Sequence, residues 1–158
     1  MTVGILTISD RAAQGIYEDE SGPALRRECE RRGWAVVQQH TVPDERVDIQ
    51  KSLRLFAEAG CDVILTTGGT GISPRDVTPE AIREIMRLEV PGFGETMRAA
   101  SLAVTANGIL SRSLAAVVGS SFVVALPGKP AGAVESLIAV AEALAHATRL
   151  AARKPTTC

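Results

Sequence analysis

The sequence is poor in aromatic residues and has no excess of charge of either sign. Aromatic residues make up 3% of the 158 residues, so aliphatic side chains must build the core. This scarcity argues against a surface that stacks on single-stranded nucleic acid. The formal net charge is −1 at pH 7, and the 17 basic residues form no basic run. The usual signature of a DNA- or RNA-binding protein is missing, and we expect no nucleic-acid partner.

The sequence also lacks features of exported and membrane-spanning proteins. No apolar run approaches the roughly 20 residues that a transmembrane helix requires. The first residues, MTVGILTISD, carry no basic segment and reach Asp10 too early for a signal peptide. The three cysteines are widely spaced and form no CxxC motif, so we interpret Cys29 and Cys61 as buried, reduced side chains. These features predict a cytoplasmic protein without membrane contact.

Short apolar runs alternate with helical patterns along the whole chain, which predicts one domain over residues 1–158. The β-prone runs are residues 3–8, 34–42, 63–66, 114–118 and 122–126. Helices are expected at 21–32, at 44–59, from the cap and first-turn pair Thr78-Pro79 to a break at Pro91-Gly92, at about 93–104, and at 131–150. This alternation favours parallel strands in a three-layer α/β/α, Rossmann-like domain with a mostly parallel sheet.

Four polar or glycine-rich turns follow predicted strands: residues 9–11, 43–45, 67–71 and 127–129. Open parallel sheets bind ligands at the carboxyl ends of their strands, where these turns would meet. The 66–71 stretch, TTGGTG, can form an anion cradle because glycines allow positive φ angles and close approach of backbone N–H groups. It matches neither common nucleotide fingerprint, and a tight connecting turn is the alternative interpretation.

Two aspartates stand beside these turns. Asp76 follows the glycine-rich stretch and could hold Mg²⁺ against nucleotide phosphates, or could be a surface residue paired with Arg75. Asp44 is the natural second acid, although it could also cap the helix that follows it. Ser111 and Arg112 offer a hydroxyl and a guanidinium suited to phosphate, with a solvated loop as the alternative.

Together these stretches resemble the molybdopterin adenylyltransferases of the MogA/MoaB type. TTGGTG followed by PRDVTPEA, and then VPGFGE at residues 90–95, is the specific part of the match. The shorter matches are Ser9-Asp10-Arg11, residues 42–45, residues 110–112 and residues 126–130. They run from near the start to about Ala131, so the resemblance covers nearly the whole chain.

The resemblance implies a reaction in molybdenum cofactor biosynthesis. Enzymes of this type transfer AMP from Mg·ATP to the terminal phosphate of molybdopterin and release pyrophosphate. The adenylylated product then accepts molybdate, which makes a molybdate-insertion protein a candidate partner. The resemblance further implies Mg²⁺, ATP and molybdopterin as ligands and a homotrimer or hexamer as the assembly. Such a transfer depends on positioning and charge neutralisation more than on covalent chemistry.

The resemblance also assigns site residues. Asp44 and Asp76 would be the catalytic acids associated with Mg²⁺. The nucleotide and phosphate region would comprise Thr67, Gly68, Gly69, Thr70, Gly71, Pro127 and Gly128. The pterin or its phosphate would be contacted by Asp10, Ser111 and Arg112.

Two alternatives remain open. One is a catalytically silent molybdopterin-binding or scaffold protein of the MoaB type, against which the intact Asp44 and Asp76 argue. The other is a nucleotide pyrophosphatase domain of the competence-damage-inducible type, which would carry a GGLGPT-like segment where this chain reads GGTGISPRDVT. Lys129 departs from the small or amide residue expected at its position.

Overall fold

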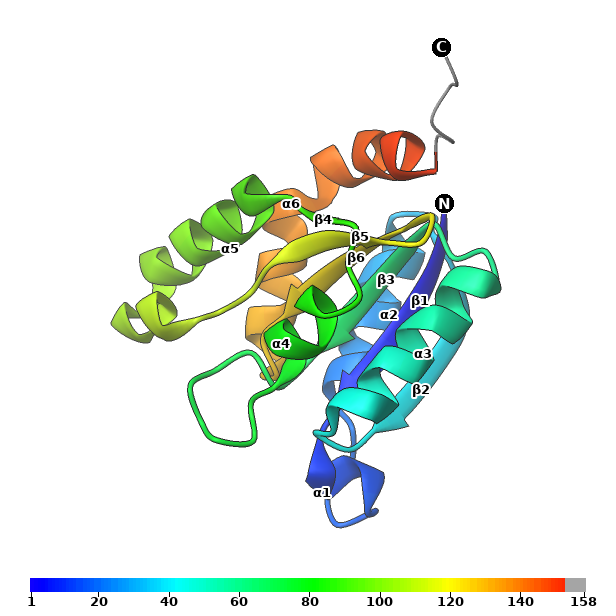
Figure 1. Ribbon diagram of the computed structural model, residues 1–158. Coiled ribbons are helices and arrows are strands. Elements are labelled where there is room, and N and C mark those ends of the chain that lie inside the picture. Colours follow the sequence, from blue (N-terminus) through cyan, green and yellow to red (C-terminus); the bar gives the residue numbers. More distant parts are fainter. Residues whose placement is uncertain (153–158) are drawn as a thin grey trace.

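A six-stranded sheet forms the centre of the computed structural model, which describes residues 1–152 (Figure 1). The strands are β1 (Thr2–Ile8), β2 (Ala35–Val42), β3 (Val63–Thr67), β4 (Leu88–Glu89), β5 (Ala115–Val118) and β6 (Ser121–Leu126), in the order β2-β1-β3-β6-β5-β4. The last six residues of the domain predicted over 1–158 lie outside the described residues, and so does Cys158. The predicted three-layer α/β class is confirmed.

Most of the sheet is parallel, as predicted: β2, β1, β3 and β6 run in one direction. β5 runs against both β6 and β4, which the strand pattern did not predict. The reason is local, because Gly119-Ser120 joins β5 to β6 as a tight hairpin and Gly119 has a φ of 59°. A parallel connection would need a crossover of about a dozen residues.

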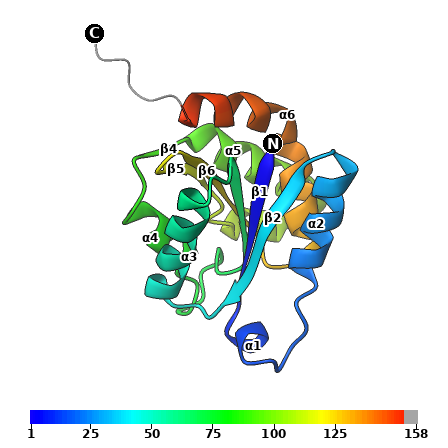
Figure 2. The ribbon, with the colours of Figure 1, turned by 90° about the vertical axis from the view of Figure 1, so that its right-hand side faces the viewer.

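Helices cover both faces of the sheet (Figure 2). On one face lie α2 (Ser21–Arg31), α5 (Pro91–Val104) and α6 (Pro130–Ala151), which share a core with Val3, Leu65 and Val124. On the other face lie α3 (Arg46–Glu58) and α4 (Thr78–Arg83), which pack against Leu6, Ile64 and Val123. Strands covered on both sides explain the continuous apolar runs in the sequence.

The cysteine prediction is confirmed for the described part of the chain. Cys29 and Cys61 are free thiols buried on opposite faces of the sheet. Burial raises the pKa of Cys29 to about 12 and also raises that of Cys61, so neither is poised to react as a thiolate. Within residues 1–152, no helix combines the length and apolarity that crossing a membrane requires.

Several predicted helix boundaries are wrong by a few residues. Pro91 begins α5 instead of ending the helix before it, since proline suits the first turn, where N–H groups lack helical partners. Thr78 is the first residue of α4 and not its cap, because its hydroxyl donates to the Gly68 carbonyl at 2.8 Å. Three short elements escaped prediction: α1 (Asp10–Ala13), β4 and the 3-10 helix η1 (Ala106–Leu110).

The register of the strands sets the position of the site. Thr7 of β1 pairs with Thr41 and with Thr67, and Thr67 pairs with Leu126. The carboxyl ends of four strands therefore stand level, at the lower end of the sheet in Figure 1. Because β5 runs in the opposite direction, the residues that lead into it reach this same edge, where the Arg112 N–H donates to the Thr70 carbonyl at 2.9 Å.

Candidate active site

The turns after β3 and β6 are in direct contact at the carboxyl edge. The Gly68 N–H donates to the Leu126 carbonyl at 3.2 Å, and the Thr67 hydroxyl donates to the Pro127 carbonyl at 2.7 Å. A Cβ atom on Gly128 would lie 3.3 Å from the Gly68 Cα. The structure thus brings together the two segments that the family resemblance assigned to nucleotide phosphates.

Gly68 and Gly69 are required by the geometry of this loop. Their φ angles are 106° and 65°, which side chains rarely tolerate. A Cβ atom on Gly68 would stand 2.1 Å from the Ile8 carbonyl oxygen, and one on Gly69 would stand 2.3 Å from the Thr78 hydroxyl. The loop backbone therefore lies against the end of β1 and the start of α4.

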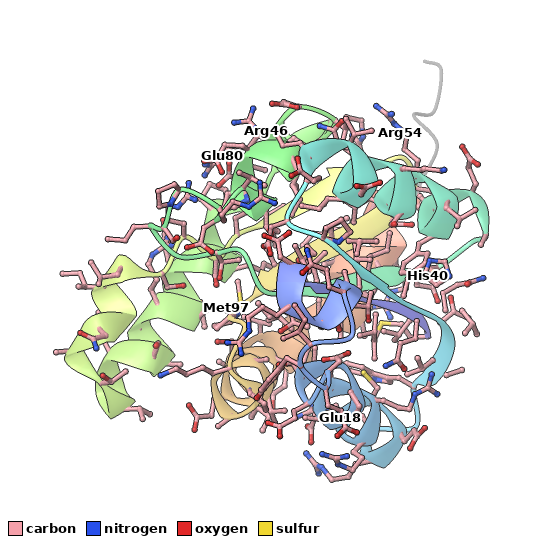
Figure 3. All side chains as sticks on the ribbon, turned by 90° about the horizontal axis from the view of Figure 1, so that it is seen from below. Glu18, His40, Arg46, Arg54, Glu80 and Met97 are labelled. Atoms are coloured by element: carbon pink, nitrogen blue, oxygen red, sulfur yellow. The ribbon has the colours of Figure 1, made fainter. Side chains whose placement is uncertain are left out.

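Two cavities adjoin the loop and share Gly128. The first, of about 260 Å³, is polar and is lined in part by Ser9, Tyr17, Asp19, Asp44, Gly69 and Asp76. The second, of about 460 Å³, is lined in part by Thr70, Gly71, Leu110, Ser111, Lys129 and Gly132. Figure 3 looks onto this edge, with Glu18 on one side of it and Glu80 on the other.

Asp10 and Asp44 tie the turns after β1 and β2 to each other. The Asp10 N–H donates to Asp44 Oδ2 at 2.8 Å, and the Asp44 N–H donates to Asp10 Oδ1 at 3.0 Å. Asp44 is not the cap of the helix that follows it, because α3 begins at Arg46 with Glu45 at its cap. Its carboxylate instead satisfies an N–H group at the start of α1, beside the first cavity.

The two aspartates differ in their affinity for protons. Burial, and then the negative charges of Asp10 and Asp76, raise the pKa of Asp44, against the lowering effect of the Asp10 N–H. The Arg75 guanidinium holds the pKa of Asp10 below its ordinary value, against the effect of burial. A nearby cation would therefore stabilise the ionised form of Asp44 more than that of Asp10, which already has Arg75 beside it.

Arg75 binds Asp10 and Glu45, and not its neighbour Asp76. Two of its nitrogens lie 2.9 Å from the two oxygens of Asp10, and one lies 2.8 Å from Glu45. Asp76 instead accepts from the Ser73 N–H at 2.8 Å and lines the first cavity. The alternative of a surface Asp76 paired with Arg75 is wrong.

Asp44 and Asp76 suit a magnesium ion that arrives with a phosphate ligand. Within residues 1–152, each uses Oδ2 to accept a backbone N–H, and neither Oδ1 accepts a hydrogen bond. In the same part of the chain, no three His, Cys, Asp or Glu residues are grouped to hold a metal. Mg²⁺ commonly takes one or two carboxylates and completes its shell with phosphate oxygens and water. The donor set fits this transient mode rather than a resident metal.

The three residues assigned to the pterin all reach the edge, but their polar groups contact other protein groups. The Asp10 carboxylate is bound by Arg75, as described above. The Ser111 hydroxyl donates to Ser113 Oγ at 3.0 Å and Ser111 lines the second cavity. The Arg112 guanidinium donates to two backbone carbonyls and to Glu80. Contact of these residues with the pterin stays a prediction.

The sequence analysis missed several residues of the first cavity. Asp19 accepts from the Thr7 hydroxyl at 2.7 Å and from the Gly22 N–H at 2.9 Å, and so fixes the start of α2. The Ser21 hydroxyl donates to the Gly128 carbonyl at 2.6 Å. An acid two residues before Ser21-Gly22-Pro23 is a helix-start signal that could have identified Asp19.

Comparisons with known proteins agree with this geometry. Residues 4–146 match the family described as a probable molybdopterin binding domain. The chain is 42% identical to the molybdopterin adenylyltransferase of Helicobacter pylori strain J99, over 94% of this chain and 86% of that protein. It is 38% identical to that of Escherichia coli strain K12, over 90% and 75%. The chain belongs to the molybdopterin-binding family of molybdenum cofactor biosynthesis.

Solved structures show the same fold. The molybdopterin biosynthesis enzyme MoaB from Thermus thermophilus superposes with a TM-score of 0.90 at 46% identity, and the match covers 99% of both chains. The resemblance inferred from the TTGGTG, PRDVTPEA and VPGFGE stretches is confirmed.

We predict that Asp44→Asn is at least as stable as the wild type at neutral pH. The amide oxygen can still accept from the Asp10 N–H, and the substitution removes a charge that burial and two carboxylates disfavour. A raised folded-state pKa means that ionisation of Asp44 destabilises the fold as the pH rises through this titration. In melting curves from about pH 3 to 8, the melting temperature of the variant should rise relative to that of the wild type as the pH increases.

Glu58→Gln, at an exposed site on α3, is the matched control and should show no such trend. A gap between Asp44→Asn and the wild type that narrows with rising pH would contradict the assigned environment of Asp44.

Proposed function

We propose that this protein transfers AMP from Mg·ATP to the terminal phosphate of molybdopterin and releases pyrophosphate. The observation that carries the proposal is the meeting of the Gly68–Gly69 loop with Asp44 and Asp76 in one polar cavity. Relatives that are 38% and 42% identical over most of their length are named molybdopterin adenylyltransferases, which supports the same activity here.

The two cavities suit the two substrates. The first, with its carboxylates, would take the adenylyl group, and the second, with Ser111, would take the pterin. Both end at Gly128 and the glycine-rich loop, so the reacting phosphates would meet there. The first turn of α6 lines the second cavity through Ala131 and Gly132, and free N–H groups at a helix start favour anions.

In the proposed reaction, a terminal phosphate oxygen of molybdopterin attacks the α-phosphorus of ATP. The bond from that phosphorus to the pyrophosphate oxygen breaks as the new bond forms. Asp44 and Asp76 would hold Mg²⁺, which when bound neutralises charge on the phosphates. The loop N–H groups would orient the phosphate oxygens, which supplies positioning rather than covalent chemistry.

The silent-scaffold alternative is less well supported. Both carboxylates are present and line the cavity, and among residues 1–152 each keeps one oxygen that accepts no hydrogen bond. A protein that only stored molybdopterin would have no use for an acid such as Asp44, whose pKa is raised chiefly by burial and further by the charges of Asp10 and Asp76.

We expect pyrophosphate release from Mg·ATP only when molybdopterin is present, together with an adenylylated product detected by mass spectrometry. Asp76→Asn keeps the shape of the side chain but removes a hard anionic ligand. It should lower turnover by roughly 10²–10³, as other single electrostatic contributors do. Molybdopterin affinity should remain, because other loops hold the pterin.

Absence of the adenylylated product with fresh molybdopterin, Mg²⁺ and excess ATP would favour the silent binder. Wild-type turnover in a correctly folded Asp76→Asn variant would remove Asp76 from the mechanism.

The assembly in this proposal is a homotrimer or a hexamer. Exposed apolar side chains gather where α5 ends and η1 follows: Leu102, Val104, Ile109 and Leu110 are 46%, 68%, 70% and 48% exposed. These elements extend away from the sheet in Figure 1. In the 90–95 segment, by contrast, Val90 and Phe93 pack against the core. A cytoplasmic location and a molybdate-insertion partner belong to the same proposal.

Light scattering should give the mass of three or six chains of 16.6 kDa each. Ile109→Asp should shift the protein towards the monomer, since it places a charge in the apolar surface. Val47→Asp, at a side chain that is 75% exposed on α3, should leave the mass unchanged. A concentration-independent mass of a single wild-type chain would refute the assembly.

A further inference from the structure

One guanidinium joins both ends of the segment that carries Asp76. Arg112 Nε donates to the Gly71 carbonyl at 2.7 Å, and Arg112 Nη2 donates to the Asp76 carbonyl at 2.6 Å. The Arg112 N–H donates to the Thr70 carbonyl at 2.9 Å. Side chain and backbone of one residue therefore bind three carbonyls of the 70–76 loop.

The loop has no regular secondary structure of its own between residues 72 and 75, and these residues are exposed. The Asp76 N–H donates to the Ser73 carbonyl at 2.9 Å and the Ser73 N–H donates to Asp76 Oδ2, but both bonds lie within the segment. Bonds inside a segment cannot set its place relative to the cavity. The side-chain bonds that do so run from Arg75, in the middle of the loop, to Asp10 and Glu45, and from Arg112 to the two ends of the loop.

Glu80, in the first turn of α4, holds the guanidinium in turn. Arg112 Nη1 donates to Glu80 Oε1. Among residues 1–152, no group hydrogen-bonds to the buried Glu80 Oε2, so Arg112 is the side chain that compensates this carboxylate. Burial is the strongest single influence and raises the pKa of Glu80. The hydrogen bond and charge of Arg112, the Glu80 N–H and the charge of Arg46 together outweigh burial, so this pKa lies below its ordinary value. A chain of contacts thus runs from α4 through Glu80 and Arg112 to the loop.

We propose that Arg112 and Glu80 are positioning residues that hold Gly71 and Asp76 in the geometry required for AMP transfer. Arg112 then acts through the loop and not as a contact of the pterin phosphate. The proposal rests on the proposed function, since it concerns the same site. The planar fork of arginine is needed, because a single lysine ammonium cannot reach two carbonyls and a carboxylate together.

The test compares Arg112→Lys, Glu80→Gln and the double variant with the wild type. Turnover should fall roughly 10- to 100-fold, as expected for a misplaced reacting group, while the KM for molybdopterin stays within about twofold. The Mg²⁺ concentration for half-maximal rate should rise, because Asp76 is displaced. The double variant should be little worse than Arg112→Lys alone, because the two residues act as one unit.

Glu84→Gln is the matched control. Glu84 follows α4 one turn beyond Glu80 and pairs with Arg46 and Gln50 of α3, away from the loop. It should keep wild-type turnover and Mg²⁺ dependence. If Glu80→Gln behaves like Glu84→Gln, or if Arg112→Lys raises the KM for molybdopterin at unchanged turnover, the positioning role is refuted.

A measurement without catalysis separates this proposal from the proposed function. Amide exchange at Ser73 and Asp76 should accelerate in Arg112→Lys and Glu80→Gln, and should not change in Glu84→Gln. An inactive wild type would overturn the proposed function, yet the exchange rates would still test the contacts from Arg112. Unchanged exchange in both loop variants would overturn the positioning role itself.

Discussion

The contact between the Gly68 backbone and the end of β1 is the constraint on which the site depends. Gly68 lies so close to the Ile8 carbonyl that any side chain would collide with it. This approach is possible because β1, β3 and β6 end level with one another. The same level edge places Asp10 and Asp44 beside the loop. Because β5 runs in the reverse direction, Arg112, which precedes it, reaches this edge as well.

Electrostatics then distinguishes the acids at this edge. Arg75 compensates Asp10, and Arg112 compensates Glu80. Asp44 has neither partner and faces burial together with the charges of Asp10 and Asp76, which raises its pKa. A divalent cation bound with nucleotide phosphates would remove that penalty. The fold thus holds beside the loop a carboxylate, Asp44, whose ionised form a bound cation would favour.

Local patterns were sufficient to predict the α/β class, the mostly parallel sheet, the buried Cys29 and Cys61, and the turns that meet at the site. Partners distant in sequence were beyond such patterns. The sequence suggested a pair between Arg75 and its neighbour Asp76 as one alternative, whereas Arg75 binds Asp10, 65 positions away. Arg112 was assigned to phosphate because a guanidinium suits it, yet 36 positions separate it from the Asp76 carbonyl that it binds. A side chain's chemistry limits its possible partners, and only the tertiary fold selects among them.

The central claim is that Asp44, Asp76 and the glycine-rich loop together hold Mg·ATP. A crystal of the protein with Mn²⁺ and a non-hydrolysable ATP analogue tests it most directly, since manganese has an anomalous signal. The account predicts an anomalous peak at Asp76 and Asp44, with phosphates beside Gly68 and Gly69. A nucleotide bound away from this loop, or a metal that touches neither aspartate, would contradict it.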